Sequence, residues 1–129
     1  MATDKERIDA GLEVRKKVLG AENVDKTMSE ADDYTRGWQE YVNRACWGEV
    51  WTRDDMEPRI RSMITLAILA TLGKSTELAS HTRGAFNNGC SMEDIQAVFY
   101  HVAVYAGVPA AFDAFRSTSA VVKQHTSGS

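Results

Sequence analysis

Proline is almost absent from this sequence, and its absence constrains the fold more than any other feature. The two prolines are Pro58 and Pro109, so residues 1–57 and 59–108 contain none. Proline interrupts helices because it lacks an amide donor and clashes with the preceding turn. Long helices are therefore possible along almost the whole chain. No segment shows sustained alternation of polar and apolar residues between turn residues, so β-strands are not expected.

Apolar residues recur three and four positions apart in six segments, the spacing that places side chains on one helix face. The segments expected to be helical are 4–19, 29–47, 55–72, 75–88, 91–106 and 110–123. Residues 47–55 are expected to form an ordered loop rich in aromatic residues. The pattern predicts an all-α bundle of about six helices.

Capping residues mark several helix boundaries. Ser29 is expected to cap the second helix, and Asp54 or Asp55 the third, because short polar side chains accept hydrogen bonds from exposed helical amides. Ser91 followed by Asp94 resembles a capping box with the shorter acid. These positions fix the predicted starts of three helices.

The chain of 129 residues corresponds to about one domain on the usual scale of roughly 100–200 residues. We therefore expect a single domain over residues 1–129, with a flexible polar tail at 124–129. Pro58 is expected in the first turn of the third helix, where no amide donor is needed. The segment 58–72 is apolar nearly all round, which is typical of a central helix or of one in a subunit interface.

Charge and cysteine spacing argue against several classes of protein. Fifteen Lys and Arg against 18 Asp and Glu give a net charge of −3, without the basic stripe of a nucleic-acid-binding protein. The most apolar window, 63–72, is shorter than the roughly 20 residues that span a bilayer, so no membrane partner is expected. Cys46 and Cys90 form neither a CxxC motif nor a paired metal-ligand spacing. With no secretory signal at its start, the chain is expected to be cytoplasmic, with reduced thiols.

One face of the predicted helix 75–88 carries a polar stripe. At 100° per residue, four side chains fall along a single line bordered by apolar residues: Glu77, His81, Gly84 and Asn88. A glutamate one turn before a histidine can orient the imidazole and favour its protonated form, so the pair could transfer a proton near neutral pH. An exposed ion pair on a solvated helix face is the alternative interpretation.

Other polar residues beside apolar faces are candidates for a binding site. His101 and Tyr105 form a second pair one turn apart, and Arg53, Arg59 and Arg61 surround the start of the apolar helix. The planar donor fork of arginine suits a carboxylate or dicarboxylate ligand. The alternatives are a histidine at a helix or subunit interface and an ion pair within an interface.

Five stretches together resemble the 4-carboxymuconolactone decarboxylase family, in matching order and spacing across residues 8–116. They are residues 15–20, 47–53, 59–65, 77–89 and 101–111. The wider superfamily contains alkylhydroperoxidase D-like redox proteins, in which a CxxC motif precedes a histidine by four residues. Here His81 matches that histidine, whereas Lys74 and Glu77 stand at the thiol positions. Thiol peroxidase chemistry therefore does not transfer, because no thiolate is present there to attack a peroxide.

The resemblance implies an alkylhydroperoxidase D-like fold and decarboxylation of 4-carboxymuconolactone to 3-oxoadipate enol-lactone in the protocatechuate arm of the β-ketoadipate pathway. It implies a dicarboxylate lactone as substrate, no cofactor or metal, and a homo-oligomer, commonly a hexamer built as a trimer of dimers. His81, oriented by Glu77, is then expected to return a proton to carbon or to donate to the oxyanion. The expected substrate-binding residues, including one arginine that holds a carboxylate, are Arg53, Arg59, Trp47, His101, Tyr105 and Asn88.

Two other functions stay open from the sequence. One is a thiol-dependent peroxidase that uses a lone cysteine, Cys46 or Cys90, although free cysteine is more often a buried packing residue. The other is a non-catalytic member of the same fold that binds dicarboxylates or serves as a structural oligomer.

Overall fold

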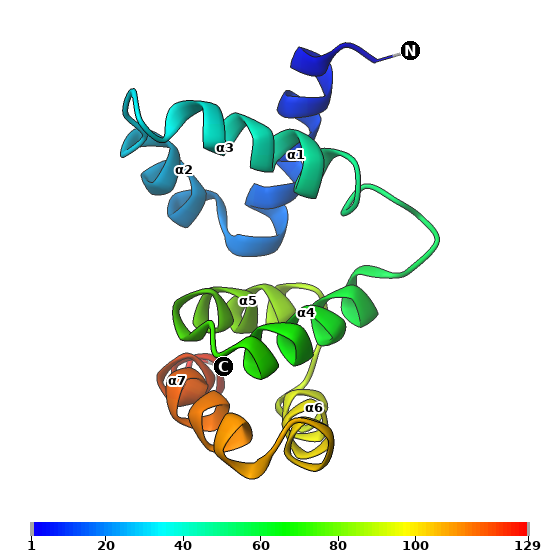
Figure 1. Ribbon diagram of the computed structural model, residues 1–129, viewed down its shortest axis with the longest axis vertical. Coiled ribbons are helices and arrows are strands. Elements are labelled where there is room, and N and C mark those ends of the chain that lie inside the picture. Colours follow the sequence, from blue (N-terminus) through cyan, green and yellow to red (C-terminus); the bar gives the residue numbers. More distant parts are fainter. Residues whose placement is uncertain (1, 129) are drawn as a thin grey trace. The chain divides into compact units, whose positions relative to one another are not determined.

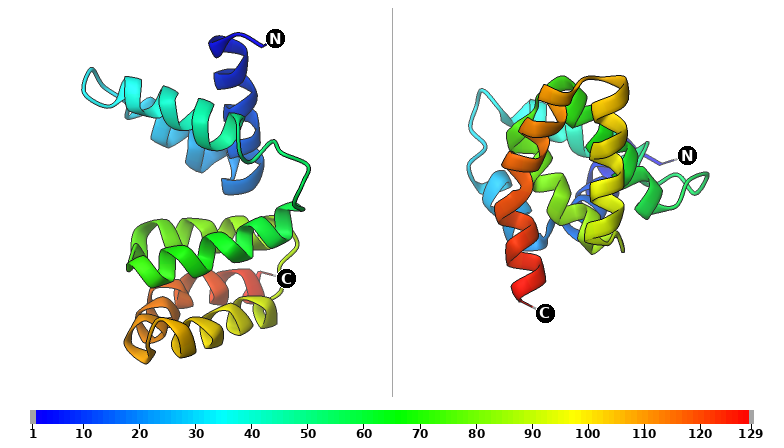
Figure 2. Two further views of the ribbon diagram at one scale, coloured as in Figure 1. Left: turned by 45° about the vertical axis from the view of Figure 1, so that its right-hand side comes forward. Right: turned by 90° about the horizontal axis from the view of Figure 1, so that it is seen from below.

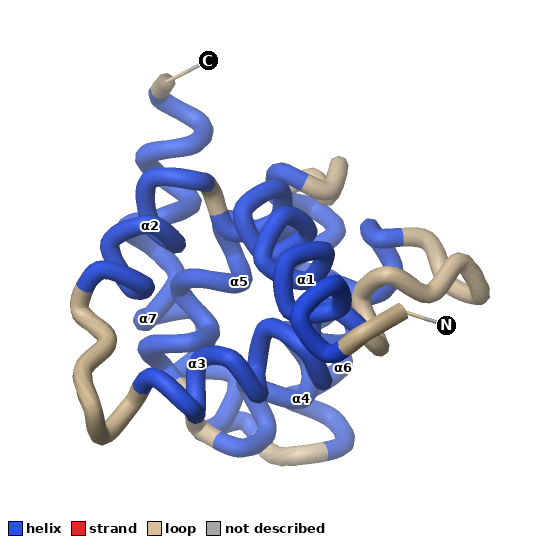
Figure 3. The backbone as a smooth tube through the Cα atoms, turned by 90° about the horizontal axis from the view of Figure 1, so that it is seen from above, coloured by secondary structure: helices blue, strands red, loops and turns tan. Residues whose placement is uncertain are grey.

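The computed structural model describes residues 2–128, and every regular element in that range is a helix (Figures 1 and 3). The predicted all-α class is therefore confirmed. The elements are α1 (Asp4–Leu19), α2 (Ala21–Ser29), α3 (Arg36–Val42), the π-helical segment η1 (Asn43–Gly48), α4 (Pro58–Leu72), α5 (Ser75–Asn87), α6 (Met92–Tyr105) and α7 (Val108–Ser127). They form two compact units, one that ends at Met56 and one that begins at Glu57.

In the N-terminal unit, α1 and η1 pack backbone against backbone. A Cβ atom added to Gly11 would overlap with the carbonyl oxygen of Asn43 and lie 2.7 Å from the amide nitrogen of Gly48. A Cβ atom added to Gly48 would lie 2.5 Å from the carbonyl oxygen of Arg7. Real Cβ atoms do not approach backbone atoms so closely, since protein interiors are already close-packed. Glycine at these two positions therefore sets the distance between α1 and η1.

A polar network ties the same two elements to α3. Arg15 on α1 donates from Nη1 to Gln39 Oε1 at 2.8 Å and to Asn43 Oδ1 at 2.9 Å. Asn43 is fully buried, so its side-chain oxygen needs such a partner. Four residues further along η1, the buried ring of Trp47 stacks on Trp51 with 4.9 Å between ring centroids. The network therefore anchors the segment that carries Trp47.

The prediction of one helix over 29–47 is wrong. Residues 21–29 form a separate helix, α2, and Ser29 is its last residue, with its hydroxyl donating to the carbonyl oxygen of Lys26. The chain turns instead at Asp32, whose carboxylate accepts from the amides of Tyr34 and Thr35. An aspartate that bonds to the amides two and three residues ahead stabilises a turn. Ser29 therefore does not cap the next helix.

The C-terminal unit is a bundle of four helices in two layers. In Figure 2, α4 and α5 (green) form one pair, and α6 and α7 (yellow to red) form the other. The main neighbours of both α5 and α6 are α4 and α7. The core between them contains the buried residues Leu66, Ala70, Leu78, Ala85, Cys90, Ile95, Val98, Phe99, Val102 and Ala114.

The helix boundaries of this unit confirm some predictions and correct others. The Ser91–Asp94 capping box is formed at the start of α6, and Pro58 lies in the first turn of α4. The N-cap of α4 is Glu57, however, and neither Asp54 nor Asp55 fills that position.

The last helix is longer than predicted. It begins at Val108 and includes Pro109, because proline in a first turn forfeits no internal hydrogen bond. It continues to Ser127, so residues 124–127 of the predicted flexible tail are helical, while residue 129 lies outside the described range. Between residues 2 and 128, none of the helices has both the length and the apolar character that crossing a bilayer requires.

Replacement of Gly11 by alanine is expected to destabilise the N-terminal unit selectively. The added methyl group must displace backbone, and overpacking of this kind costs roughly 1–3 kcal/mol of unfolding free energy or more. Trp38, Trp47 and Trp51 all lie in this unit, so tryptophan fluorescence during urea unfolding reports on it directly.

Gly37→Ala is the matched control. An added Cβ at Gly37, inside α3, meets no atom within 4 Å. This variant should be neutral or more stable by up to about 1 kcal/mol, because alanine favours the helix over glycine. A Gly11→Ala chain as stable as Gly37→Ala would contradict the packing described for α1 and η1.

Candidate functional site

The polar stripe predicted from the sequence lies on α5. Glu77 is exposed in its first turn, His81 is half-buried one turn later, and Gly84 is buried. The Nδ1 atom of His81 is itself buried. Leu78 and Ala85 face the core beside the stripe. The imidazole is therefore held at the border between core and surface, where its environment is less polar than water.

Asn88, at the C-terminal end of the stripe, is fixed by Ser62, a residue outside the predicted site. Its Nδ2 donates to Ser62 Oγ on α4 at 2.9 Å, and Ser62 is fully buried. A serine on the largely apolar helix α4 was the available signal, because a buried hydroxyl needs a hydrogen-bond partner. One amide hydrogen of Asn88 is used in this bond, and the carboxamide is held against α4.

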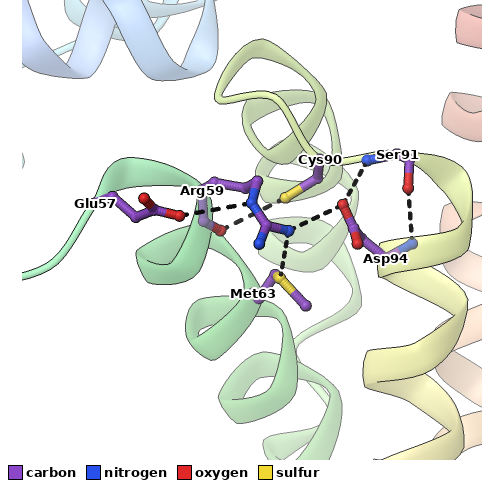
Figure 4. A network of polar contacts seen from close by, with 6 residues as sticks. All are labelled: Glu57, Arg59, Met63, Cys90, Ser91 and Asp94. Atoms are coloured by element: carbon purple, nitrogen blue, oxygen red, sulfur yellow. Dashed lines mark hydrogen bonds and ion pairs between the residues drawn. The ribbon is translucent and has the colours of Figure 1, made fainter.

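Arg59 is engaged by two carboxylates (Figure 4). Its Nη1 donates to Asp94 Oδ2 at 3.1 Å and contacts the sulfur of Met63 at 3.5 Å, while its Nε lies 3.6 Å from Glu57. Asp94 Oδ2 also accepts from the amide of Ser91, as part of the α6 capping box. This cluster joins the start of α4 to the start of α6.

The same cluster shifts the pKa of Asp94. The hydrogen bond from the Ser91 amide is the largest influence, and the charge of Arg59 adds to it, so the pKa of this carboxyl lies below its ordinary value. The carboxylate form is favoured, and the positive charge of Arg59 is largely compensated within the cluster.

His101 and Tyr105 line a separate groove between α4 and α6, with a volume of about 590 Å³. Their rings lie 4.7 Å apart, and Tyr105 is 80% exposed. Apolar residues make up most of the walls, among them Met63, Ile64 and Ala67 of α4. The residue that binds Asn88 of α5, Ser62, is not in this lining. Glu77 and His81 of α5 are likewise absent from this lining.

Trp47 and Arg53 belong to the N-terminal unit. Trp47 is buried in η1, and π-helical turns are rare elements that often occur at functional sites. Arg53 follows in the adjoining loop, 60% exposed, and forms an ion pair with Asp55. Such exposed pairs contribute little to stability, so the guanidinium of Arg53 can exchange partners at low cost.

The two cysteines are poor nucleophiles in this structure. Burial raises the pKa of the Cys46 thiol, with Arg15 opposing the shift, and it also raises the pKa of the Cys90 thiol. The Sγ of Cys90 donates to the carbonyl oxygen of Arg59 at 3.6 Å. The raised pKa values lower the reactivity of both thiols, because the thiolate is the attacking form. Among residues 2–128, no group of three or more His, Cys, Asp or Glu side chains is arranged to hold a metal ion.

Comparison with known protein families shows the family to which this chain belongs. Residues 36–120 match the sequence pattern described as the carboxymuconolactone decarboxylase family. The chain belongs to the carboxymuconolactone decarboxylase family. The match spans α3, η1, α4, α5, α6 and the first part of α7, so it includes α5 with its polar stripe and the Arg59 cluster.

Individual relatives of this family member are also enzymes named as decarboxylases. A 4-carboxymuconolactone decarboxylase of Acinetobacter baylyi is 37% identical over 120 residues, covering 93% of this chain and 90% of the relative. Nitrosuccinic acid decarboxylase npaB of Metarhizium robertsii is 38% identical over 114 residues, covering 88% of this chain and 80% of the relative. A 4-carboxymuconolactone decarboxylase sequence from Pseudomonas putida is 37% identical over 46 residues, which are 36% of this chain and 96% of that sequence.

The thiols of this family member should react slowly with a disulfide reagent. The thiolate is the form that attacks the reagent, and the pKa values of both thiols are raised. At pH 8 the folded chain should therefore release chromophore from dithiobis(nitrobenzoate) much more slowly than the chain unfolded in guanidinium. Reaction of either cysteine in the folded chain at the rate of a free thiol would contradict the described burial.

Asp94→Asn should lower stability in a pH-dependent way. The folded pKa of Asp94 lies below its unfolded value, so the carboxylate contributes stability above about pH 4, and this contribution is lost as the pH falls through the folded pKa. The difference in urea midpoint between wild type and Asp94→Asn should thus be largest near neutral pH and shrink in acid. Asp113→Asn, at an exposed position of α7, is the control and should show little difference at either pH.

Proposed function

We propose that this chain is a cofactor-independent carboxy-lyase that converts 4-carboxymuconolactone to 3-oxoadipate enol-lactone with loss of CO2, in protocatechuate catabolism. The observation that carries the proposal is the 37% identity to a 4-carboxymuconolactone decarboxylase over 93% of the chain. The half-buried histidine of α5, one turn after a glutamate, supplies a group suited to proton transfer.

The structure of the substrate explains why side chains alone could catalyse this decarboxylation without a cofactor. The departing carboxylate sits on a carbon conjugated through a double bond to the lactone carbonyl. When the bond to CO2 breaks, its electron pair passes into that system and forms a dienolate-like oxyanion. The protein must hold the carboxylates, stabilise the charge that develops on oxygen, and return one proton to carbon. In this proposal no metal or organic cofactor takes up the electrons.

His81 and Glu77 are proposed as the proton-transfer pair. The helical spacing of α5 brings the two side chains to one face, about 5–6 Å apart at Cβ. Glu77 then orients the imidazole and stabilises its protonated form, and His81 returns the proton or donates to the oxyanion. Asn88, held by Ser62, has a second amide hydrogen beyond the one in that bond, and it is proposed to donate to the substrate.

Arg53 is the stronger of the two candidates for holding a substrate carboxylate. Arg59 already donates to Asp94 and lies beside Glu57, so a third carboxylate would meet a largely compensated charge. Arg53 is exposed and has only to exchange its surface ion pair with Asp55. Trp47, His101 and Tyr105 complete the proposed set of substrate-binding residues, as the sequence predicts.

The proposal extends to assembly and location. A homo-oligomer, of the hexameric trimer-of-dimers kind that the sequence resemblance implies, is proposed as the active form. We also propose a cytoplasmic location and a small dicarboxylate lactone as the partner, with no nucleic acid or membrane. The exposed apolar side chains of α4, among them Ile64, Ile68 and Leu72, support the assembly.

A second substrate deserves a parallel assay because the npaB relative, a nitrosuccinic acid decarboxylase, is equally similar at 38% identity. A nitro group beside the departing carboxylate can also accept the released electron pair. Purified chain should therefore be incubated separately with freshly generated 4-carboxymuconolactone and with nitrosuccinic acid, with CO2 release measured. Faster turnover of the lactone supports the proposal, and turnover of nitrosuccinic acid alone would replace it.

Substitution of the proposed pair should separate chemistry from folding. We expect His81→Ala to lower kcat by about 100-fold or more, in the range usual for loss of a general acid. Glu77→Gln should lower kcat less and shift the pH dependence, because the imidazole loses its charged partner. His125→Gln and Glu40→Gln, at exposed positions of α7 and α3, are matched controls with wild-type rates. Wild-type turnover by both His81→Ala and Glu77→Gln, with circular dichroism unchanged, would refute the assignment.

A further inference from the structure

Asn88 is the one asparagine of this chain that is followed by glycine. The other three, Asn23, Asn43 and Asn87, precede valine, arginine and asparagine. An asparagine before glycine is especially reactive in an unfolded chain, because no Cβ atom hinders attack by the next backbone nitrogen on the side-chain carbonyl carbon. The proposed decarboxylation uses the Asn88 carboxamide as a donor, but this reactivity is a separate property of the same residue.

The glycine is required by the way in which α5 ends. Gly89 has a φ of +93°, in the left-handed region. Its amide donates to the carbonyl oxygen of Phe86 at 3.1 Å, and the amide of Cys90 donates to that of Ala85 at 2.9 Å. These two bonds form the Schellman pattern that closes a helix. The residue that ends α5 therefore also creates the reactive Asn88–Gly89 pair.

The folded turn keeps the reacting groups apart. Ring closure requires the Gly89 nitrogen to lose its proton and to reach the Cγ atom of Asn88. That proton is engaged with Phe86, and the Asn88 backbone, with a ψ of 10°, does not bring the nitrogen to the side-chain carbonyl. The leaving group is also held, because Nδ2 of Asn88 donates at 2.9 Å to Oγ of the fully buried Ser62. Reaction therefore requires local opening of this turn.

We propose that Asn88 is a site of spontaneous deamidation and that the Ser62 hydroxyl sets its rate in the folded chain. The Gly89 nitrogen attacks Cγ of Asn88, the bond from Cγ to Nδ2 breaks, and ammonia leaves with the proton that the attacking nitrogen has lost. The resulting succinimide ring then adds one water molecule. Opening at one carbonyl gives aspartate, and opening at the other gives isoaspartate, in which the main chain passes through the side chain. Water is the sole co-reactant.

Deamidation changes the charge of the α5 stripe. A neutral side chain that donates two hydrogens becomes a carboxylate that only accepts. The consequence for catalysis rests on the proposed function, because a dicarboxylate substrate would be repelled by a carboxylate at this position. Asn88→Asp, which reproduces one product, should therefore raise the KM for 4-carboxymuconolactone several-fold. An unchanged KM would contradict the donor role of Asn88, whereas deamidation itself is measured without any substrate.

Peptide mass spectrometry of the full chain, incubated at pH 8, tests the modification. In guanidinium, Asn88 should convert to the acid many-fold faster than Asn23, Asn43 or Asn87, which serve as internal references. Gly89→Ala should slow that conversion many-fold, a result that does not depend on how well the variant folds. Conversion of Asn88 no faster than that of the three references, or no slowing by Gly89→Ala, would overturn the proposal.

Ser62→Ala tests the part assigned to the hydroxyl. The variant removes the acceptor of Asn88 Nδ2 and leaves the backbone bonds of the turn in place. Folded wild type should convert many-fold more slowly than the chain in guanidinium, and folded Ser62→Ala several-fold faster than folded wild type. Urea midpoints measured in parallel establish that each chain is folded during the incubation. Equal rates in folded wild type and Ser62→Ala would overturn the proposal.

Thr118→Val is the matched control. It removes another fully buried hydroxyl from the same unit, one that donates to the carbonyl oxygen of Ala114 within α7 at 2.8 Å. Because this hydroxyl does not contact Asn88, the variant should deamidate at the wild-type rate. Acceleration by Thr118→Val equal to that by Ser62→Ala would assign the effect to general loss of stability and would overturn the role of Ser62.

Discussion

Burial of one face of α5 is the constraint on which the proposed chemistry depends. Leu78, Thr82 and Ala85 recur at helical spacing and are almost completely inaccessible to solvent. Their packing fixes the rotation of the helix, and the Thr82 hydroxyl is satisfied within it by the carbonyl oxygen of Leu78 at 2.8 Å. With that face fixed, His81 lies half-buried at the border of the core, and Glu77 lies exposed one turn before it. A histidine placed this way has a defined orientation and a less polar environment, which are the conditions for controlled proton transfer.

Two arginines near the start of α4, Arg53 and Arg59, differ in the partners that hold their charges. Arg59 is drawn into a cluster with Asp94 that fastens α4 to the capping box of α6. Arg53, outside regular structure, has only an exposed ion pair. A charge that is compensated by fixed neighbours stabilises the fold, whereas a charge that can exchange its partner can hold a ligand. The raised pKa values of the Cys46 and Cys90 thiols oppose peroxidase chemistry and fit packing roles.

Local rules explain which features the sequence could predict. The Ser91–Asp94 box, Pro58 in a first turn and the helix that carries Glu77 and His81 depend on residues within one or two turns, and each is present as predicted. The contacts that the sequence did not predict join distant segments. Gly11 of α1 contacts the backbone of Asn43 in η1, and α2 and α3 lie between these two elements in the sequence. Arg59 donates to Asp94, which is 35 positions further along the chain. Neither leaves a periodic signal in the sequence. Ser62 was recognisable only as a polar residue in an apolar helix, and its partner Asn88 is 26 positions away.

Product formation from freshly generated 4-carboxymuconolactone by the purified chain, stripped of metal with a chelator, is the decisive test of the proposed reaction. CO2 and 3-oxoadipate enol-lactone should appear together in equal amounts, without any added cofactor. Lactone that disappears no faster than in buffer, or turnover that returns only when a metal is restored, would contradict the proposed reaction.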